Sequence, residues 1–120
     1  MKTPITQSRL DSMRSAIEGA DARALASLYA DNAVMRIIDS ANPPSHPRLI
    51  DGKKAIAAFY EDICGRKMTH HVEDMLVDGD RLAFTEACEY PDGSRVYCAA
   101  LAEFADGRIA RQTTIQAWDE

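Results

Sequence analysis

Three short Gly/Asp turns divide the second half of the chain into strands. The turns are "DGD" at 78–80, "PDGS" at 91–94 and "ADG" at 105–107. Between them, apolar and polar residues alternate with a period of two, which is typical of half-buried β-strands. From residue 68 onward the sequence therefore predicts a meander of four strands.

Helical spacing precedes these strands. One apolar repeat ends at Gly19, and a second follows a Gly-Ala-Asp break. "DGKKAIAAFYEDIC" at 51–64 predicts a third helix, with Asp51 as its cap. The apolar residues of the three repeats are Leu10, Met13 and Ile17; Leu25, Leu28 and Tyr29; and Ile56, Phe59, Tyr60 and Ile63.

One further strand is predicted between the second and third helices, at "NAVMRIID", 32–39. The segment that follows, "SANPPSHPRL", contains three prolines and predicts a loop. The plan is α+β, with helices packed against a sheet. A chain of 120 residues is predicted to form one domain, spanning 1–120.

Charge and hydropathy limit the partners. The net charge is −5, and no Lys/Arg cluster offsets it, so a nucleic-acid surface or an anionic membrane surface is not expected. No apolar run approaches the roughly 18 residues that a membrane span needs. "MKTPITQSRLDSM" lacks the apolar centre of a signal peptide, so a cytoplasmic location is predicted.

Strand alternation assigns side chains to the two faces of the sheet. If Asp92-Gly93 and Asp106-Gly107 are both two-residue turns, small residues share one face of the last three strands and aromatic residues share the other. The small-residue set is Ala83, Thr85, Ala87, Glu89, Val96, Cys98, Ala100, Ala102, Thr113, Ile115, Ala117 and Asp119. The other set is Phe84, Cys88, Tyr90, Arg95, Tyr97, Leu101, Gln116 and Trp118.

The same register places Cys88 and Cys98 on opposite faces, and no C-x-x-C motif is present. These two cysteines and Cys64 are therefore expected to be reduced, buried and inert. We expect the small-residue face to line a pocket. An exposed aromatic face would mark a partner surface, read most simply as a homodimer contact through Tyr90, Tyr97 and Trp118. The alternative is that the faces are inverted and the aromatic residues form the core.

Four segments, in this order and spacing, resemble the superfamily of nuclear transport factor 2, ketosteroid isomerase and the SnoaL-like polyketide cyclases. They are "ALASLYADNAVM" (24–35), "IDGKKAIAAFYEDI" (50–63), "THHVEDMLVDGDRLAF" (69–84) and "ADGRIARQTTIQAWDE" (105–120). The resemblance implies a cone-shaped, curved antiparallel sheet wrapped around three N-terminal helices, with an apolar pocket between them. It says little about function, because this fold hosts isomerases, cyclases, lyases and proteins without catalytic activity.

The ketosteroid isomerase machinery does not carry over to this sequence. The resemblance places its aspartate base at Ile37, its first-helix tyrosine at Met13, and its late-strand acid at Ala100 or Ala102. None of these side chains can hold or donate a proton, so ordinary steroid isomerisation is not expected. Tyr60 does match a supporting tyrosine of the isomerases.

The doublet His70-His71 raises the question of a metal site. Adjacent strand residues point to opposite sides, so the two rings cannot bind one ion together, and His46 would add only a second isolated imidazole. No metal and no cofactor are therefore predicted. In SnoaL-like relatives the first histidine of such a "THH" segment lines the pocket, which implies that His70 points inward.

The leading hypothesis is a cofactor-independent acid–base enzyme of isomerase, cyclase or lyase type. His70 and Asp39 would exchange a proton, and Tyr60 would donate a hydrogen bond to the developing oxyanion of a small hydrophobic carbonyl or cyclic compound. The other predicted pocket residues are Met13, Ile37, Phe59, Thr85, Cys98, Ala100, Ile115 and Asp119.

Each of these residues also has a possible structural role without catalysis. Asp39 could cap the strand before the proline loop, His70 could be a hydrogen-bonded core residue, Tyr60 could serve packing, and Asp119 could be solvated. Two further functions follow from such roles. One is a ligand-binding module without turnover, and the other is a dimeric interaction domain.

Overall fold

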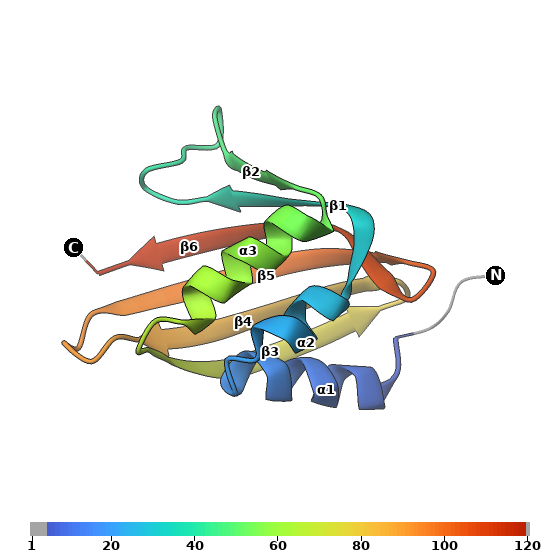
Figure 1. Cartoon of the computed structure of the whole chain (residues 1–120), viewed down its shortest axis with the longest axis horizontal. Coiled ribbons are helices and arrows are strands. Elements are labelled where there is room, and N and C mark those ends of the chain that lie inside the picture. Colours follow the sequence, from blue (N-terminus) through green and yellow to red (C-terminus); the bar gives the residue numbers. More distant parts are fainter. Residues whose placement is uncertain (1–4, 120) are drawn as a thin grey trace.

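The computed structural model describes residues 5–119 as three helices packed on one face of a curved, six-stranded sheet (Figure 1). We call the helix-covered side of the sheet its inner face and the opposite side its outer face. The helices are α1 (Gln7–Glu18), α2 (Ala22–Ser27) and α3 (Lys53–Cys64). The strands are β1 (Tyr29–Ile38), β2 (Arg48–Asp51), β3 (Thr69–Asp78), β4 (Arg81–Glu89), β5 (Arg95–Ala105) and β6 (Arg108–Trp118).

Capping side chains fix where the first two helices begin. Thr6 accepts a hydrogen bond from the backbone of Arg9 at the start of α1, and Asp21 does the same for Ala24 at the start of α2. The predicted cap of the third helix is wrong. Gly52, with φ of +93°, occupies the N-cap position of α3, and no side chain caps that helix.

The strand order across the sheet is β2-β1-β6-β5-β4-β3. All neighbours are antiparallel except β1 and β6, which pair in parallel, so the α+β prediction is confirmed with a mixed sheet. β2 was not predicted. Its first two residues belong to the segment predicted to be a loop, and it covers only four residues, too few to show a period.

The β4–β5 hairpin does not have the predicted register. Glu89 pairs with Arg95 and Cys88 with Val96, and the backbone of Tyr90 donates to Ser94 across the loop. The loop thus has three residues, with Gly93 at φ of +92°. Proline fits the first turn position of such a loop, whereas a two-residue type I′ turn needs positive φ at both central residues.

The β5–β6 hairpin has the predicted turn, followed by an unpredicted bulge. Ala105 pairs with Arg108 around Asp106 and Gly107, which both have positive φ. An irregularity between Glu103 and Phe104 then shifts the register by one residue. Most side chains of β6 therefore point to the face opposite to the predicted one.

These two shifts decide which side chains face the helices. The predicted inner set is correct on β5, where Val96, Cys98, Ala100 and Ala102 are buried, and wrong on β4 and β6. The even-numbered residues of β4 and most of β6 point inward instead. Those that line the space beneath the helices are Phe84, Glu86, Cys88, Gln112, Thr114, Gln116 and Trp118.

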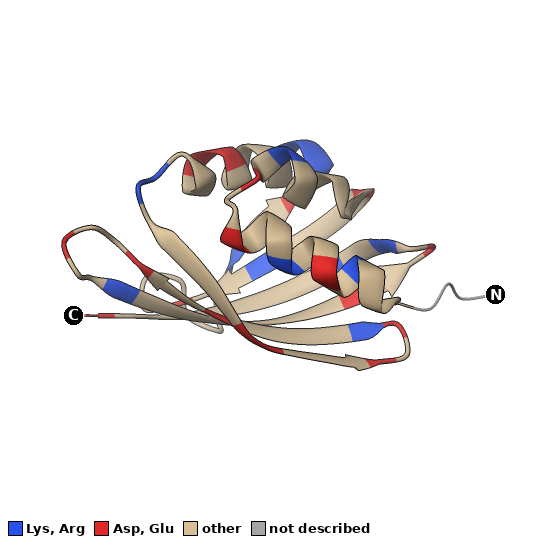
Figure 2. Ribbon diagram, turned by 90° about the horizontal axis from the view of Figure 1, so that it is seen from below, with Lys and Arg blue, Asp and Glu red and all other residues tan. Residues whose placement is uncertain are grey.

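The hydrophobic core lies between the helices and the inner face of the sheet. Its fully buried side chains come from every layer and include Met13, Met35, Ile56, Leu82 and Ile109. No helix lies over the outer face in the described part of the chain (Figure 2). Among residues 5–119, no helix is long and apolar enough to cross a bilayer.

Candidate active site

A cavity of about 200 Å³ lies between the helices and the inner face of the sheet. Its walls are mainly apolar, with polar side chains contributed by β1, β3, β4, β6 and α3. Of the residues predicted to line a pocket, eight line this cavity. They are Met13, Ile37, Asp39, Phe59, Tyr60, His70, Cys98 and Ala100.

Three predicted pocket residues lie elsewhere. Thr85 and Ile115 point to the outer face because of the two register shifts, and Ile115 is 54% exposed. Asp119 follows the end of β6, where its carboxylate accepts a hydrogen bond from the Arg95 backbone at 2.9 Å. Asp119 is exposed to solvent, which agrees with the alternative role given for it above.

Two of the three aromatic residues predicted for the outer face are on the inner face. Tyr90 and Trp118 line the cavity and stack with ring centroids 6.0 Å apart. The Tyr90 hydroxyl accepts a hydrogen bond from Arg66 at 2.9 Å. Only Tyr97 of the predicted three is on the outer face, where its hydroxyl donates to Glu73.

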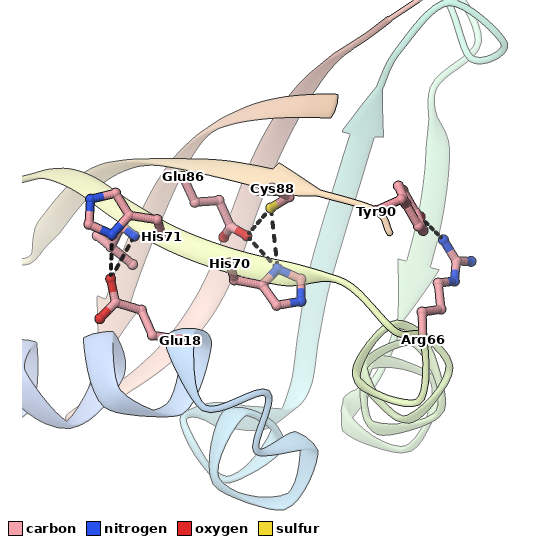
Figure 3. A network of polar contacts seen from close by, with 8 residues as sticks. Glu18, Arg66, His70, His71, Glu86, Cys88 and Tyr90 are labelled. Carbon is pink, nitrogen blue, oxygen red and sulfur yellow. Dashed lines mark hydrogen bonds and ion pairs between the residues drawn. The ribbon is translucent and has the colours of Figure 1, made fainter. Parts of the chain in front are cut away.

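The most ionisable part of the wall is a group of three side chains, which we call the His70 cluster: His70, Glu86 and Cys88. The Nδ1 atom of His70 is 3.2 Å from the Cys88 sulfur and 3.5 Å from Oε1 of Glu86. The Cys88 thiol donates to the same Oε1 at 3.1 Å. Figure 3 shows the three side chains turned toward one another from β3 and β4.

Strand pairing explains why these residues meet. His70 and Cys88 are directly opposite each other in the β3–β4 ladder, and Glu86 precedes Cys88 by two residues on the same face. Sequence reasoning missed Glu86 and Cys88 because it assumed the two-residue turn, which pointed both side chains the wrong way. Pro91 in "PDGS" was the available signal for the longer loop.

Charge and burial set the protonation of the His70 cluster. Hydrogen bonds to Cys88 and Glu86 raise the pKa of His70 to about 9. A hydrogen bond with Cys98, together with burial, raises the pKa of the Cys88 thiol far above its ordinary range. At neutral pH these shifts favour a protonated His70 ring, paired with the Glu86 carboxylate and lying beside a neutral Cys88 thiol.

Two atoms of the His70 cluster have no hydrogen-bond partner within residues 5–119. These are Nε2 of His70 and Oε2 of Glu86, since the contacts above use only Nδ1 and Oε1. No enclosed side-chain nitrogen or oxygen of the described, non-exposed residues lacks a partner. Both atoms are therefore accessible at the protein surface or the cavity, and their residues line the cavity.

His71 belongs to a different environment. Its side chain is 72% exposed, against 6% for His70, and lies 3.3 Å from a carboxylate oxygen of Glu18 on α1. The same carboxylate accepts the backbone N–H of Val72 at 2.9 Å. His71 thus helps to join α1 to the edge strand, on the side away from the His70 cluster (Figure 3).

Asp39 does not approach His70 through any hydrogen bond or ion pair among the described residues. Its Oδ1 atom accepts the backbone N–H groups of Ala41 and Asn42 and the Asn42 side-chain amide, at 2.8 to 2.9 Å. It therefore caps the loop after β1, which was the alternative interpretation of this residue. β1 and β3 are separated by three strands, or about 19 Å along the sheet at the usual strand spacing.

Tyr60 belongs to a buried series of hydrogen bonds that we call the Tyr29 chain: Tyr60, Tyr29, Gln112 and Thr114. The Tyr29 hydroxyl donates to Gln112 Oε1 at 2.6 Å, and the Gln112 amide donates to the Thr114 hydroxyl oxygen at 3.0 Å. Since Tyr29 has only one hydroxyl proton, Tyr60 must donate at the Tyr60–Tyr29 contact, which is also 2.6 Å.

This direction affects the predicted role of Tyr60. With its proton donated to Tyr29, the Tyr60 oxygen presents a lone pair to the cavity instead of a proton. Tyr60 would donate to an oxyanion only if the Gln112 amide turned over and the chain reversed. Burial raises the pKa of both tyrosine hydroxyls, so both remain protonated at neutral pH.

The cysteines also differ from the predicted arrangement. Cys88 and Cys98 are on the same face and pack in one small buried cluster, instead of pointing to opposite faces. All three cysteines are free thiols. Among the described residues, His70, Glu86 and Cys88 form a group of three potential metal ligands with donor atoms within 4.8 Å of one another.

A family model for the SnoaL-like domain matches residues 10–112. The chain is a member of the SnoaL-like family. No curated protein matches it significantly. An NTF2-like protein of unknown function from Mesorhizobium loti superposes with a TM-score of 0.78 and 21% identity, over 90% of this chain and 87% of that one.

Two other similar structures carry functional descriptions. A proposed ketosteroid isomerase from Kribbella flavida has a TM-score of 0.72 and 21% identity, over 92% of this chain and 75% of that one. IdmH, a proposed polyketide cyclase from Streptomyces antibioticus, has a TM-score of 0.64 and 22% identity, over 89% and 88%. At these identities the similarity establishes the fold of this SnoaL-like protein.

Proposed function

We propose that this SnoaL-like protein is an acid–base enzyme of isomerase, cyclase or lyase type, acting on a small, largely apolar carbonyl or cyclic compound. The observation that carries the proposal is the largely enclosed His70–Glu86 pair in the wall of an apolar cavity, with one proton donor and one acceptor not used by contacts within the protein. Groups of this kind, set apart from water, are suited to moving protons.

The chemistry would use the two free atoms of the His70 cluster. The Nε2–H group of His70 would donate to the carbonyl oxygen of the substrate, while Oε2 of Glu86 would take a proton from the adjacent carbon. The product of this step is a neutral enol. Return of the proton from Glu86 to another carbon, and of the oxygen-bound proton to His70, completes an isomerisation with the enzyme unchanged.

Glu86 replaces Asp39 as the carboxylate in this proposal. Asp39 is engaged by the loop after β1, and Glu86 contacts His70 directly. Tyr60 would hold the far end of the substrate by accepting a hydrogen bond from a hydroxyl group. The predicted oxyanion role of Tyr60 requires the reversed Tyr29 chain.

Deuterium exchange tests the proposal without knowledge of the natural substrate. Chelator-treated protein would be incubated in D₂O with a panel of small cyclic ketones, and loss of the protons next to the carbonyl would be followed by NMR. We expect exchange that depends on His70 and is retained in His71→Gln. If ketones bind in the cavity but none exchanges faster than in buffer, the protein is a ligand-binding module and the enzyme proposal is wrong.

A homodimer remains a proposal, with a changed set of contact residues. Among the large apolar side chains exposed on the outer face are Tyr97, Leu101 and Ile115, at 43%, 52% and 54%. They come from the adjacent strands β5 and β6 and support a self-association surface. Light scattering should give twice the chain mass for the wild type and the monomer mass for Leu101→Glu. A monomeric wild type would contradict this proposal.

A cytoplasmic location also remains a prediction.

A further inference from the structure

We infer that His70, Glu86 and Cys88 form a binding site for a divalent cation of the Zn²⁺ class, held by one imidazole nitrogen, one carboxylate oxygen and one thiolate. Their donor atoms come from two adjacent strands and point to a common centre. The inference goes beyond the proposed function, because it rests on this geometry and does not require the reaction to occur.

The distances suit a tetrahedral ion. The three donor atoms are 3.1, 3.2 and 3.5 Å apart and form a nearly equilateral triangle. The point equidistant from them lies about 1.9 Å from each, whereas Zn²⁺ sits roughly 2.0–2.3 Å from such ligands. The ion would therefore rest about 1 Å out of their plane, as on one face of a tetrahedron, with only small movements of the side chains.

The donor types select the class of metal. A nitrogen, a sulfur and a single oxygen suit Zn²⁺ and similar transition metals, whereas Mg²⁺ and Ca²⁺ require mostly oxygen ligands. The thiolate and the carboxylate would together balance the double charge of the ion inside an apolar cavity. Both Cys88 and His70 are almost fully enclosed, and the Glu86 side chain is 18% exposed, so little water competes for the ion.

Nearby groups leave room for a fourth ligand from the cavity. Nδ1 would bind the ion, which leaves Nε2 of His70 directed to the cavity. Cys98 packs beside Cys88 but is not one of the three donors, so the fourth position would stay open to water or a small molecule. Neither His71 nor His46 belongs to this group, and its members meet only through the β3–β4 register, which the spacing of the histidines in the sequence does not reveal.

A bound ion would replace the protons of the His70 cluster. Zn²⁺ needs the imidazole neutral and the thiol deprotonated, so binding would release both of those protons. It would also occupy Oε1 of Glu86, through which His70 and Glu86 are paired. Zn²⁺ and the proposed proton transfer would thus compete for one site.

Metal titration of the untagged, chelator-treated protein tests the site directly. Co²⁺ should bind one equivalent per chain and give tetrahedral visible bands with a thiolate-to-cobalt charge-transfer band in the near ultraviolet. Zn²⁺ should displace it and should compete with a chromophoric chelator. Cys88→Ser should remove the charge-transfer band, and each of Cys88→Ser, His70→Ala and Glu86→Gln should weaken Zn²⁺ binding by about tenfold or more.

Matched controls use residues outside the group. His71→Ala and Cys64→Ser should change the Zn²⁺ affinity by less than about twofold, since neither side chain belongs to the three donors. Circular dichroism of each apo variant checks the fold, and Glu86→Gln serves if Cys88→Ser does not fold. Absence of Zn²⁺ and Co²⁺ binding by the wild type, or binding that survives the loss of Cys88 and Glu86, would overturn the inference. Neither result depends on finding exchange with a ketone.

Discussion

Two groups of polar side chains line the same cavity, and they handle protons differently. The Tyr29 chain joins two tyrosine hydroxyls, an amide and a threonine hydroxyl in one direction, and all of its members are neutral. In the His70 cluster, the imidazole of His70 and the thiol of Cys88 both lie against one carboxylate oxygen of Glu86. Its members can exchange protons or hold a cation.

The difference follows from where each group lies in the fold. The Tyr29 chain spans β1, β6 and α3, and both Tyr29 and Gln112 are buried in the core. There, each donor needs an acceptor, so a closed chain is the stable arrangement. The His70 cluster lies on β3 and β4, toward the other edge of the sheet, and leaves one donor and one acceptor open. We interpret the first as structural support and the second as the reactive part.

The largest expected effect separates the two groups by activity. His70→Gln and Glu86→Gln should each lower the ketone exchange rate about 10²- to 10⁴-fold, the usual contribution of a positioned acid or base. Tyr60→Phe should lower it less than about tenfold, because only a substrate contact is lost. Rates measured by NMR at equal protein concentration check this. Equal losses in all three variants would remove the distinction.

Of these two groups, only the His70 cluster should make the free energy of unfolding depend on pH. The folded-state pKa of His70, about 9, is above its unfolded value of 6.5. Its contribution is therefore fully present below pH 6.5 and is lost as the pH rises through 9. We expect the wild type to lose about 1–3 kcal/mol relative to His70→Gln across this window. Urea unfolding of metal-free protein at pH 6 and pH 9.5 measures the difference, and parallel curves for the two proteins would argue against it.

A smaller effect should appear when the Tyr29 chain is interrupted. Tyr29→Phe leaves the buried Gln112 oxygen without its donor, which should destabilise the fold by about 1–2 kcal/mol at every pH. Tyr90→Phe is the matched control, since it removes an exposed hydrogen bond to Arg66 and should cost less than about 0.5 kcal/mol. Urea unfolding at pH 7 compares them. A Tyr29→Phe protein as stable as the control would show that the chain does not support the core.

The sequence predicted the elements better than the faces of the sheet. Helical spacing located three helices, three Gly/Asp turns located four strands, and a cluster of apolar residues at 32–39 located β1, because these signals depend on neighbouring residues. The face of β4 depended on the loop at "PDGS", where Pro91 indicated the correct length. The face of β6 depended on a bulge near Phe104, for which no local signal was found.

The candidate site was predicted in part for the same reason. His70 could be placed on the cavity wall, but its partners lie on a neighbouring strand and depend on register. Asp39 and His70 are far apart because three strands lie between β1 and β3, and local sequence patterns do not reveal strand order. Strand order and register are long-range properties, so Glu86 and Cys88 could not be found from alternation once the loop had been assigned one residue too short.

The central claim is that His70 and Glu86 form an ion pair within the cavity wall, and NMR titration of the His70 ring tests it most directly. In metal-free wild type the ring should remain protonated at pH 7.5 and titrate with a pKa of about 9. In Glu86→Gln the pKa should fall toward its ordinary value. A His70 ring that is already neutral at pH 7.5 in the wild type, or one indifferent to the loss of Glu86, would contradict the account.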